Sequence, residues 1–159
     1  MKIRNVREED FIKIAELSRK CNPMATERNS IYHLFTKFFS GTSFVAEESQ
    51  GIIGFILGFL SQDNPREAYI HLLCVHPNHR REGVASNLLE KFINEVKKKE
   101  IERISLITKP VNRRAISFYK KHGFINRKRP GTYKVGDINV FRDYNGEGED
   151  MVIFEKSVE

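Results

Sequence analysis

The chain has 159 residues, of which 40% are hydrophobic and 30% charged, and its 27 Lys and Arg residues exceed its 21 Asp and Glu residues by a net charge of +6. This balance excludes a largely disordered protein, and the length is enough for one domain to bury a core without a metal. The basic excess attracts anions in general, so a polyanionic cofactor, an acidic substrate and nucleic acid all stay open.

The cysteines indicate whether a metal or redox site is expected, and the apolar runs indicate where in the cell the protein is expected. Cys21 and Cys74 are far apart in the sequence, with no CxxC pair and no histidine at zinc-ligand spacing, so we expect neither a structural metal nor a redox couple. The longest apolar run, Gly51–Leu60, is too short to cross a bilayer, and the polar alternation after residues 1–4 does not form a signal-peptide core. We therefore expect a cytoplasmic protein that does not bind a membrane.

The N-terminal half alternates between helical and strand-like patterns. Apolar residues at helical spacing predict one helix from Asp10 and a second over about 26–39, which Gly41 ends. A turn at 49–51 predicts a hairpin in the middle of this half. Period-two alternation and apolar runs predict strands over residues 2–6, 42–47, 52–60 and 68–75.

After residue 79 the apolar period becomes that of a helix over 84–96, whose three closing lysines suit the helix dipole. We then expect a strand over 104–108, a helix over 112–122 and a final strand pair at about 124–134 and 150–156. No repeat or linker interrupts this series. We therefore expect one domain over 1–159, with an α/β (α+β) architecture in which a mixed sheet has helices on both faces.

A basic, glycine-containing segment, Arg80-Arg81-Glu82-Gly83-Val84-Ala85, lies where this amphipathic helix begins. The first turn of a helix has free backbone N–H groups and a partial positive charge, so it can hold a pyrophosphate. Gly83 and Ala85 would let phosphate oxygens approach the amides, and the arginines would add charge-assisted contacts. A solvated basic turn is the alternative that this segment alone leaves open.

The same segment resembles the signature of the GNAT acyltransferase superfamily: Arg or Gln, two residues, Gly, one residue, then Gly or Ala. Arg80, Gly83 and Ala85 match in order, and the preceding Leu73-Cys74-Val75-His76-Pro77 resembles that family's strand end. The resemblance implies that the amides of 81–86 hold the pyrophosphate of CoA and that the strand pairs with its pantetheine arm. The cofactor-binding residues implied are Leu73, Cys74, Val75, Arg80, Arg81, Glu82, Gly83, Val84, Ala85 and Ser86.

Residues 112–124 resemble the family's second motif, in which an Asn opens a helix and a Tyr lies one turn before its Gly-Phe end. By this resemblance Asn112 contacts pantetheine or a bridging water, and Tyr119 lies near the CoA sulfur. A helix cap and a buried helical face are the structural alternatives for these two residues. Because both motifs occur in the family's order, the resemblance covers 68–125. It implies a GNAT-like, mostly antiparallel mixed sheet, acetyl-CoA as co-substrate and no metal.

Acyl transfer requires a neutral amine, whereas an alkylamine with a pKa near ~10 is mostly protonated at neutral pH. His71 is the first candidate for the base, because histidines titrate near neutrality and it stands where several small-molecule members of the family carry Glu. Glu67, on the same strand face by alternation, is the second. A histidine satisfied within the sheet and a solvated carboxylate are their structural alternatives. Tyr119 is the expected acid for the departing thiolate.

The N-terminal helices and the C-terminal strands are expected to form the acceptor site. The segment 143–150 contains four acidic residues in an otherwise basic chain. It could bind a cationic amine, or it could be a solvated hairpin loop.

These patterns predict an N-acetyltransferase that moves acetyl from acetyl-CoA to a primary amine by direct attack, with a non-catalytic acyl-CoA sensor or scaffold as the alternative. The partners expected are a CoA thioester and an amine substrate, small molecule or peptide. No nucleic-acid motif accompanies the basic charge, so CoA accounts for it more economically. The acceptor, the acyl length and the oligomeric state, a homodimer included, are left open.

Overall fold

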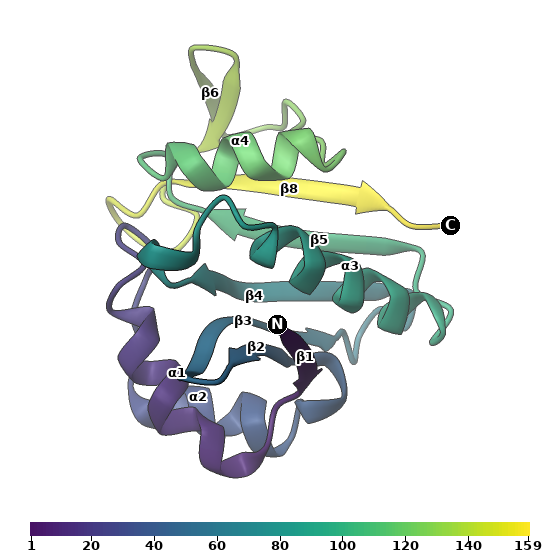
Figure 1. The fold of residues 1–159 in the computed structure, drawn as a ribbon. Coiled ribbons are helices and arrows are strands. Elements are labelled where there is room, and N and C mark those ends of the chain that lie inside the picture. Colours follow the sequence, from purple (N-terminus) through teal and green to yellow (C-terminus); the bar gives the residue numbers. More distant parts are fainter.

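All 159 residues are described by the computed structural model, in which eight strands form one sheet in the order β1-β2-β3-β4-β5-β8-β7-β6 (Figure 1). Every neighbouring pair is antiparallel except β4 and β5, which are parallel. This confirms the mixed, mostly antiparallel sheet. In chain order the elements are β1 Lys2–Asn5, α1 Phe11–Ser18, α2 Asn29–Lys37, β2 Phe44–Glu48, β3 Gly51–Leu60, β4 Glu67–Val75, α3 Val84–Lys97, β5 Arg103–Thr108, α4 Arg113–Lys121, β6 Thr132–Val135, β7 Ile138–Phe141 and β8 Met151–Ser157.

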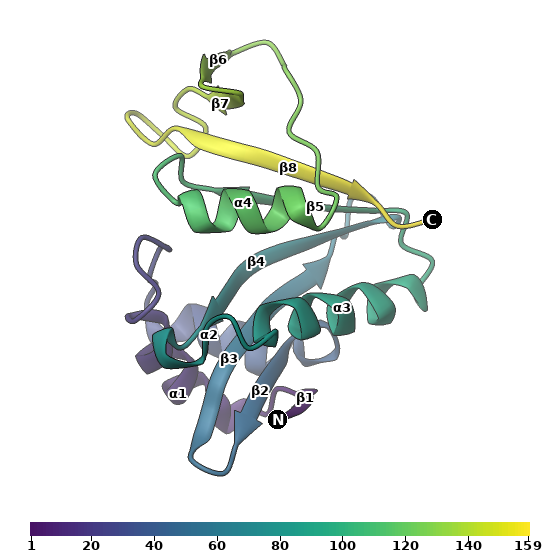
Figure 2. The same ribbon diagram turned by 45° about the horizontal axis from the view of Figure 1, so that its top comes forward.

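Helices cover both faces of the sheet, as the alternating pattern predicts (Figure 2). On one face the apolar stripe of α3 and the α4 residue Tyr119 pack with the sheet in a cluster of 22 buried residues. On the other face α1 and α2 bury 12 residues with β2, β3 and β4. Gly58 of β3 is required for the first of these cores, because a Cβ there would lie 2.4 Å from the ring of Phe92. No helix combines the length and apolar composition that a bilayer crossing requires.

The central feature of the sheet is the divergence of β4 from β5 (Figure 2). The two strands pair only where residues 67–69 face residues 103–105. Beyond this short ladder β5 continues to pair with β8 and β4 continues to pair with β3. The second half of β4 therefore has a free edge on the side of β5, and the sheet opens into a wedge.

A β-bulge in β4 determines which side chains face this wedge. Leu57 of β3 pairs with Leu72, but the next residue, Gly58, pairs with Ile70, so His71 is the extra residue. A bulge of this kind reverses the alternation of side chains beyond it. Ile70 accordingly belongs to the core under α3, whereas Leu72 belongs to the core under α1 and α2.

Two expected element boundaries are wrong. The helix expected over 26–39 begins only at Asn29, so residues 26–28 belong to the connection 19–28 between α1 and α2. The strand expected over about 124–134 is replaced by one isolated bridge at Ile125 and a short hairpin of β6 and β7. Gly136 and Asp137 form the turn of that hairpin, and a Gly-Asp pair between two alternating runs is a hairpin signal that could have predicted it.

The expectation of no redox couple is also wrong. Cys21, which follows α1, and Cys74, in β4, form a disulfide across a sequence separation of 53, with Cα atoms 5.9 Å apart. The sequence did not predict this pairing, because the two cysteines are far apart along the chain and only the packing of α1 against β4 brings the thiols together. The bond ties the connection after α1 to the free-edged half of β4.

Candidate functional site

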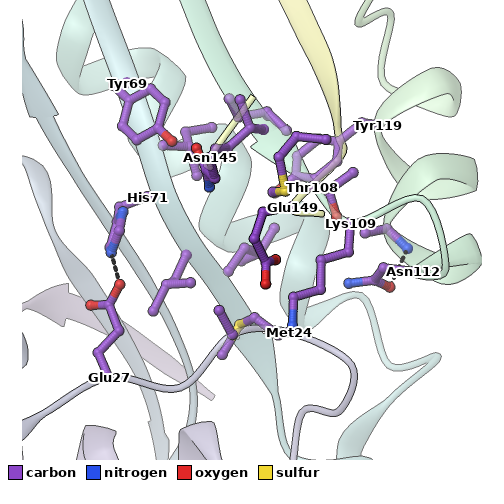
Figure 3. Close-up of a pocket in the computed structure, with 18 residues that line it drawn as sticks. Met24, Glu27, Tyr69, His71, Thr108, Lys109, Asn112, Tyr119, Asn145 and Glu149 are labelled. Carbon is purple, nitrogen blue, oxygen red and sulfur yellow. Dashed lines mark hydrogen bonds and ion pairs between the residues drawn. The ribbon is translucent and has the colours of Figure 1, made fainter. Parts of the chain in front are cut away.

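Two cavities meet in the wedge between β4 and β5. The larger, about 750 Å³, is lined by the end of β4, the loop 77–83, the start of α3 and one side of α4. The smaller, about 270 Å³, is lined by the connection 24–27, β4, the end of β5 and residues 145–151 (Figure 3). Both cavities include Leu73, Asn112, Ala115 and Tyr119 in their walls. Two ligands, one in each cavity, would therefore meet at Tyr119.

The backbone of the loop before α3 is shaped for an anion. Arg81 and Gly83 both have positive φ angles, 67° and 80°, and Gly83 is the N-cap of α3. Such alternation of backbone conformation points successive N–H groups into one concavity. The amide of Asn87 is bonded to the carbonyl of Gly83, so the amides of residues 84–86 have no helical acceptor. A Cβ at Gly83 would meet nothing within 4 Å, so this side of the loop is open.

The charges around the larger cavity are all positive. Its charged lining residues are Arg80, Arg81, Arg114 and Lys121, and no acidic residue lines it. Burial first, and then the nearby charge of Arg114, lower the pKa of Arg80. Cations held together in this way without an acidic partner repel one another, and a polyanion would relieve that repulsion.

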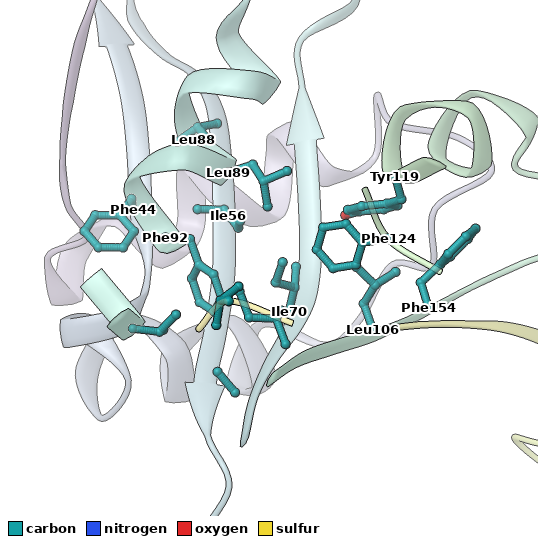
Figure 4. Packing of buried hydrophobic residues seen from close by; sticks show 14 of the residues in the cluster. Phe44, Ile56, Ile70, Leu88, Leu89, Phe92, Leu106, Tyr119, Phe124 and Phe154 are labelled. Atoms are coloured by element: carbon teal, nitrogen blue, oxygen red, sulfur yellow. The ribbon is translucent and has the colours of Figure 1, made fainter. Parts of the chain in front are cut away.

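Asn112 caps a helix and Tyr119 lies on a buried helical face, which are the structural alternatives predicted from the sequence. Both residues also line both cavities. The side chain of Asn112 caps α4 by accepting a hydrogen bond from the amide of Ala115 at 3.2 Å. Tyr119 is 6% exposed, and its ring packs against Phe124 and Phe154 (Figure 4). Burial, with a smaller contribution from Tyr69, raises the pKa of Tyr119 above that of an ordinary tyrosine. Its phenol therefore stays protonated and can donate a proton.

In the smaller cavity the predicted base, His71, is paired with a carboxylate. Its Nε2 lies 2.6 Å from Oε1 of Glu27 (Figure 3). Its ring is stacked on that of Phe35, with centroids 5.0 Å apart. The amide of Glu27 donates to the hydroxyl of Tyr32 at 3.0 Å, which holds the connection in place. The second oxygen of Glu27 is buried and has no hydrogen-bond partner. The imidazole thus has a fixed orientation and an adjacent negative charge.

Sequence reasoning missed Glu27 and Tyr69, which also line this cavity. Asn29 and Ser30 are typical helix-capping residues, and they could have shown that Glu27 precedes the helix, though not that it meets His71. Burial, with the nearby Tyr144 and Glu27 adding to it, raises the pKa of Tyr69 to about 12. Both phenols at the wedge are therefore neutral at ordinary pH.

The acidic segment 143–150 is divided between structural and cavity-lining residues. Asp150 accepts from the amide of Asp143, and Asp143 accepts from the amide of Gly148, at 2.8 and 2.7 Å. Asp150 also accepts from the hydroxyl of Tyr133. Glu149 instead lines the smaller cavity and has no ion-pair partner.

Two of the predicted site residues line neither cavity. Glu67 accepts hydrogen bonds from Arg103 at 2.7 Å and Ser105 at 2.8 Å. Burial acts to raise the pKa of Glu67, but these two donors lower it overall. This placement does not favour Glu67 as a base. The carboxylate of Glu82 lies 3.1 Å from His79 and outside the larger cavity.

The other predicted residues come together as expected. His71 lines the smaller cavity, and the residues implied for the cofactor that line the larger one are Leu73, Cys74, Val75, Arg80, Arg81, Gly83, Val84, Ala85, Ser86, Asn112 and Tyr119. Their roles stay predictions, because lining a cavity is not contact with a ligand.

Comparisons with known proteins identify relatives that are acetyltransferases. The model of the acetyltransferase (GNAT) family matches residues 11–124. The chain is 27% identical over 144 residues to N-alpha-acetyltransferase 30 of Xenopus laevis, covering 88% of this chain and 53% of that protein. It thus spans about half, or less, of the length of such curated relatives.

Two solved structures share the fold. Ard1 from Thermoplasma volcanium superimposes with a TM-score of 0.81 at 21% identity, covering 99% of this chain and 97% of that one. Diaminobutyrate acetyltransferase EctA from Paenibacillus lautus, in complex with L-2,4-diaminobutyric acid and coenzyme A, has a TM-score of 0.75 at 21% identity, with coverage of 96% and 93%.

Proposed function

The chain belongs to the acetyltransferase (GNAT) family, and on that premise we propose that it transfers an acetyl group from acetyl-CoA to a primary amine by direct attack. The observation that carries the proposal is the meeting of the two cavities at Tyr119. Their shapes and charges differ as those of a cofactor site and an acceptor site should. A reaction between two bound substrates needs them in contact, with the reacting atoms held in place.

The larger cavity suits CoA in size, backbone geometry and charge. The amides of 81–86 and the open face of Gly83 would hold the pyrophosphate, assisted by Arg80 and Arg81. The free edge of β4 around Leu73 and Val75 leaves main-chain groups available to pair with pantetheine. Acetyl-CoA supplies the acetyl group as a thioester, and no metal is part of the proposal.

His71 is the proposed base. Its imidazole would take a proton from the acceptor amine, directly or through one water molecule, in the smaller cavity. Glu27, held 2.6 Å away, would orient the ring and stabilise the imidazolium as it forms. Stacking on Phe35 restricts the ring further.

Tyr119 is the proposed acid. Its place in the wall of both cavities puts the phenol where the thioester sulfur and the amine would meet. Because burial raises its pKa, the proton stays on the phenol until the thiolate departs.

A turnover assay tests the proposal against the sensor alternative. The protein is incubated with acetyl-CoA and pooled primary amines, free CoA is measured as a new thiol, and the products are identified by mass. An acetyltransferase releases CoA in proportion to acetylated amine, with Tyr119→Phe as the impaired control. Tight binding of acetyl-CoA without turnover for any amine would favour the sensor.

The partners and compartment belong to the same proposal. We expect a CoA thioester and an amine as partners, neither nucleic acid nor membrane, and a cytoplasmic location. A disulfide is unusual in a reducing compartment, so the alkylation state of Cys21 and Cys74 in freshly lysed cells tests the location. Light scattering after size exclusion distinguishes a monomer from a homodimer.

A further inference from the structure

We propose that the smaller cavity takes a free amino acid that carries a second, side-chain amine. In this arrangement Glu149 binds the α-ammonium, Lys109 binds the α-carboxylate, and the side-chain amine is the group acetylated. The inference rests on the proposed function and narrows its substrate class.

The unpaired charges on the wall of the smaller cavity suit such an amino acid. Glu149 and Lys109 both line the smaller cavity, and neither has an ion-pair partner. Figure 3 shows both side chains extending toward Met24. No ion pair of 4.0 Å or less joins the two side chains, so each charge is available to a ligand. One free carboxylate and one free ammonium on the wall of one cavity match a ligand that carries both an ammonium and a carboxylate.

The other acidic groups near Glu149 already have hydrogen-bond partners within the protein. Glu27 is bonded to His71, and Asp143 and Asp150 hold the backbone of their own segment. These last two bonds fix the loop that presents Glu149. Glu149 therefore sits on a braced segment and Lys109 directly follows β5, and both are separate from the pair proposed for proton transfer.

The volume of the smaller cavity also suits a small acceptor. Ligand clefts in proteins usually have volumes of about 300–1,000 Å³. At about 270 Å³ the smaller cavity lies just below this range, whereas its neighbour holds about 750 Å³. A small acceptor fits this volume better than an extended peptide.

The chemistry requires the reacting amine to be the second one. An α-ammonium bound to Glu149 keeps its proton and cannot attack. The free side-chain amine forms the new N–C bond to the acetyl carbon and gives one proton to His71. The C–S bond breaks, and the sulfur takes a proton from Tyr119. Since one proton is taken and one is given, the products are the acetylated amino acid and CoA thiol.

A matched acceptor series tests the inference. With the full chain and acetyl-CoA, kcat/KM is measured for L-2,4-diaminobutyric acid, its carboxamide, the diamine left when the carboxylate is removed, and the amino acid left when the α-amine is removed. Ornithine, lysine and a short peptide extend the series. We expect at least one diamino acid to exceed its carboxamide and its diamine by about tenfold or more, the size of one charge-assisted contact.

Two variants assign that preference to residues. Lys109→Met should abolish the preference for the carboxylate, and Glu149→Gln should abolish the preference for the α-amine. Lys128→Met and Glu147→Gln change matched charges outside both cavities and should preserve both preferences.

The outcomes separate the two proposals. Turnover of amines with no preference for a diamino acid, with a preference for the peptide, or with preferences that survive Lys109→Met and Glu149→Gln, overturns this inference alone. No turnover of any amine by a protein that binds acetyl-CoA overturns the proposed function itself.

Discussion

The two cavities differ in how the chain builds them. The larger takes most of its proposed anion-binding groups from one continuous stretch, residues 80–86, which includes the first amides of α3, and α4 adds Arg114 and Lys121. The smaller takes its polar groups from five segments: 24–27, 69–73, 106–112, 145–151 and the part of α4 that carries Tyr119. A continuous site depends on local backbone conformation, whereas a dispersed one depends on how the whole sheet packs. Substitutions should therefore affect the larger cavity through the backbone and the smaller one through side chains.

The largest effect is expected where the cavities meet. Tyr119→Phe keeps the ring and its packing but removes the phenolic proton, so kcat should fall about 100-fold while acetyl-CoA affinity changes little. Single-turnover kinetics and calorimetry check the two halves of this expectation. Because its pKa is raised, Tyr119 should remain protonated in the wild type beyond about pH 10, where ordinary tyrosines ionise. An unchanged kcat with chemistry rate-limiting would leave Tyr119 a packing role only.

The next effect concerns the smaller cavity. His71→Gln removes the proposed base at similar polarity and size, so kcat/KM should fall about 30-fold and its pH profile should differ from that of the wild type. The residual rate should then follow the amine's own ionisation. Glu27→Gln should reduce the rate less, because it removes only the orienting charge. A pH profile of His71→Gln identical to that of the wild type would exclude His71 as the base.

The larger cavity is tested through its backbone. Gly83→Val places a branched side chain in the open face of the loop, so acetyl-CoA affinity should weaken at least about tenfold, or about 1.4 kcal/mol. Part of that loss could come from strain at a positive φ, and Gly136→Val controls for it. Gly136 also has a positive φ and open space around its Cβ position, but it lies in the β6–β7 turn, outside both cavities. Equal affinity in Gly83→Val and the wild type, by calorimetry, would remove the loop from the site.

The smallest effect on catalysis is expected from a change outside both cavities, which acts on stability instead, in the half of the sheet that carries α1 and α2. Burial acts to raise the pKa of Asp10, but the guanidinium of Arg4 and the amide of Arg7, at 2.8 and 2.7 Å, lower it overall. A lowered folded pKa stabilises the protein above the unfolded pKa of about 4, and that contribution is lost as pH falls through the folded pKa.

Asp10→Asn should therefore cost about 2 kcal/mol in urea unfolding at pH 7. The difference between variant and wild type should shrink progressively in the acid range. A difference independent of pH would mean that the carboxylate charge is not what stabilises this half of the protein.

Local patterns in the sequence indicated the anion-binding loop of the larger cavity, and the family resemblance favoured this interpretation over a solvated basic turn. A helix start, a glycine beside it and two arginines within a few residues act through neighbouring backbone groups, and the structure brings them together as predicted. Asn112 and Tyr119 were placed at the site by the resemblance of residues 112–124 to the family's second motif, whereas their local pattern predicted only a helix cap and a buried helical face. The helices on both faces of the sheet followed from apolar periodicity alone.

The smaller cavity was decided by tertiary structure. Glu27 and His71 are 44 residues apart, and their contact needs α2 to begin at Asn29 and β4 to bulge at His71. Strict alternation placed Glu67 beside His71, but pairing with β5 binds Glu67 to Arg103 instead. The disulfide also depends on tertiary structure, because packing brings together two cysteines that are 53 residues apart in the sequence. Sequence determines interactions between neighbours along the chain, whereas contacts between distant segments depend on a register and a packing that no local pattern specifies.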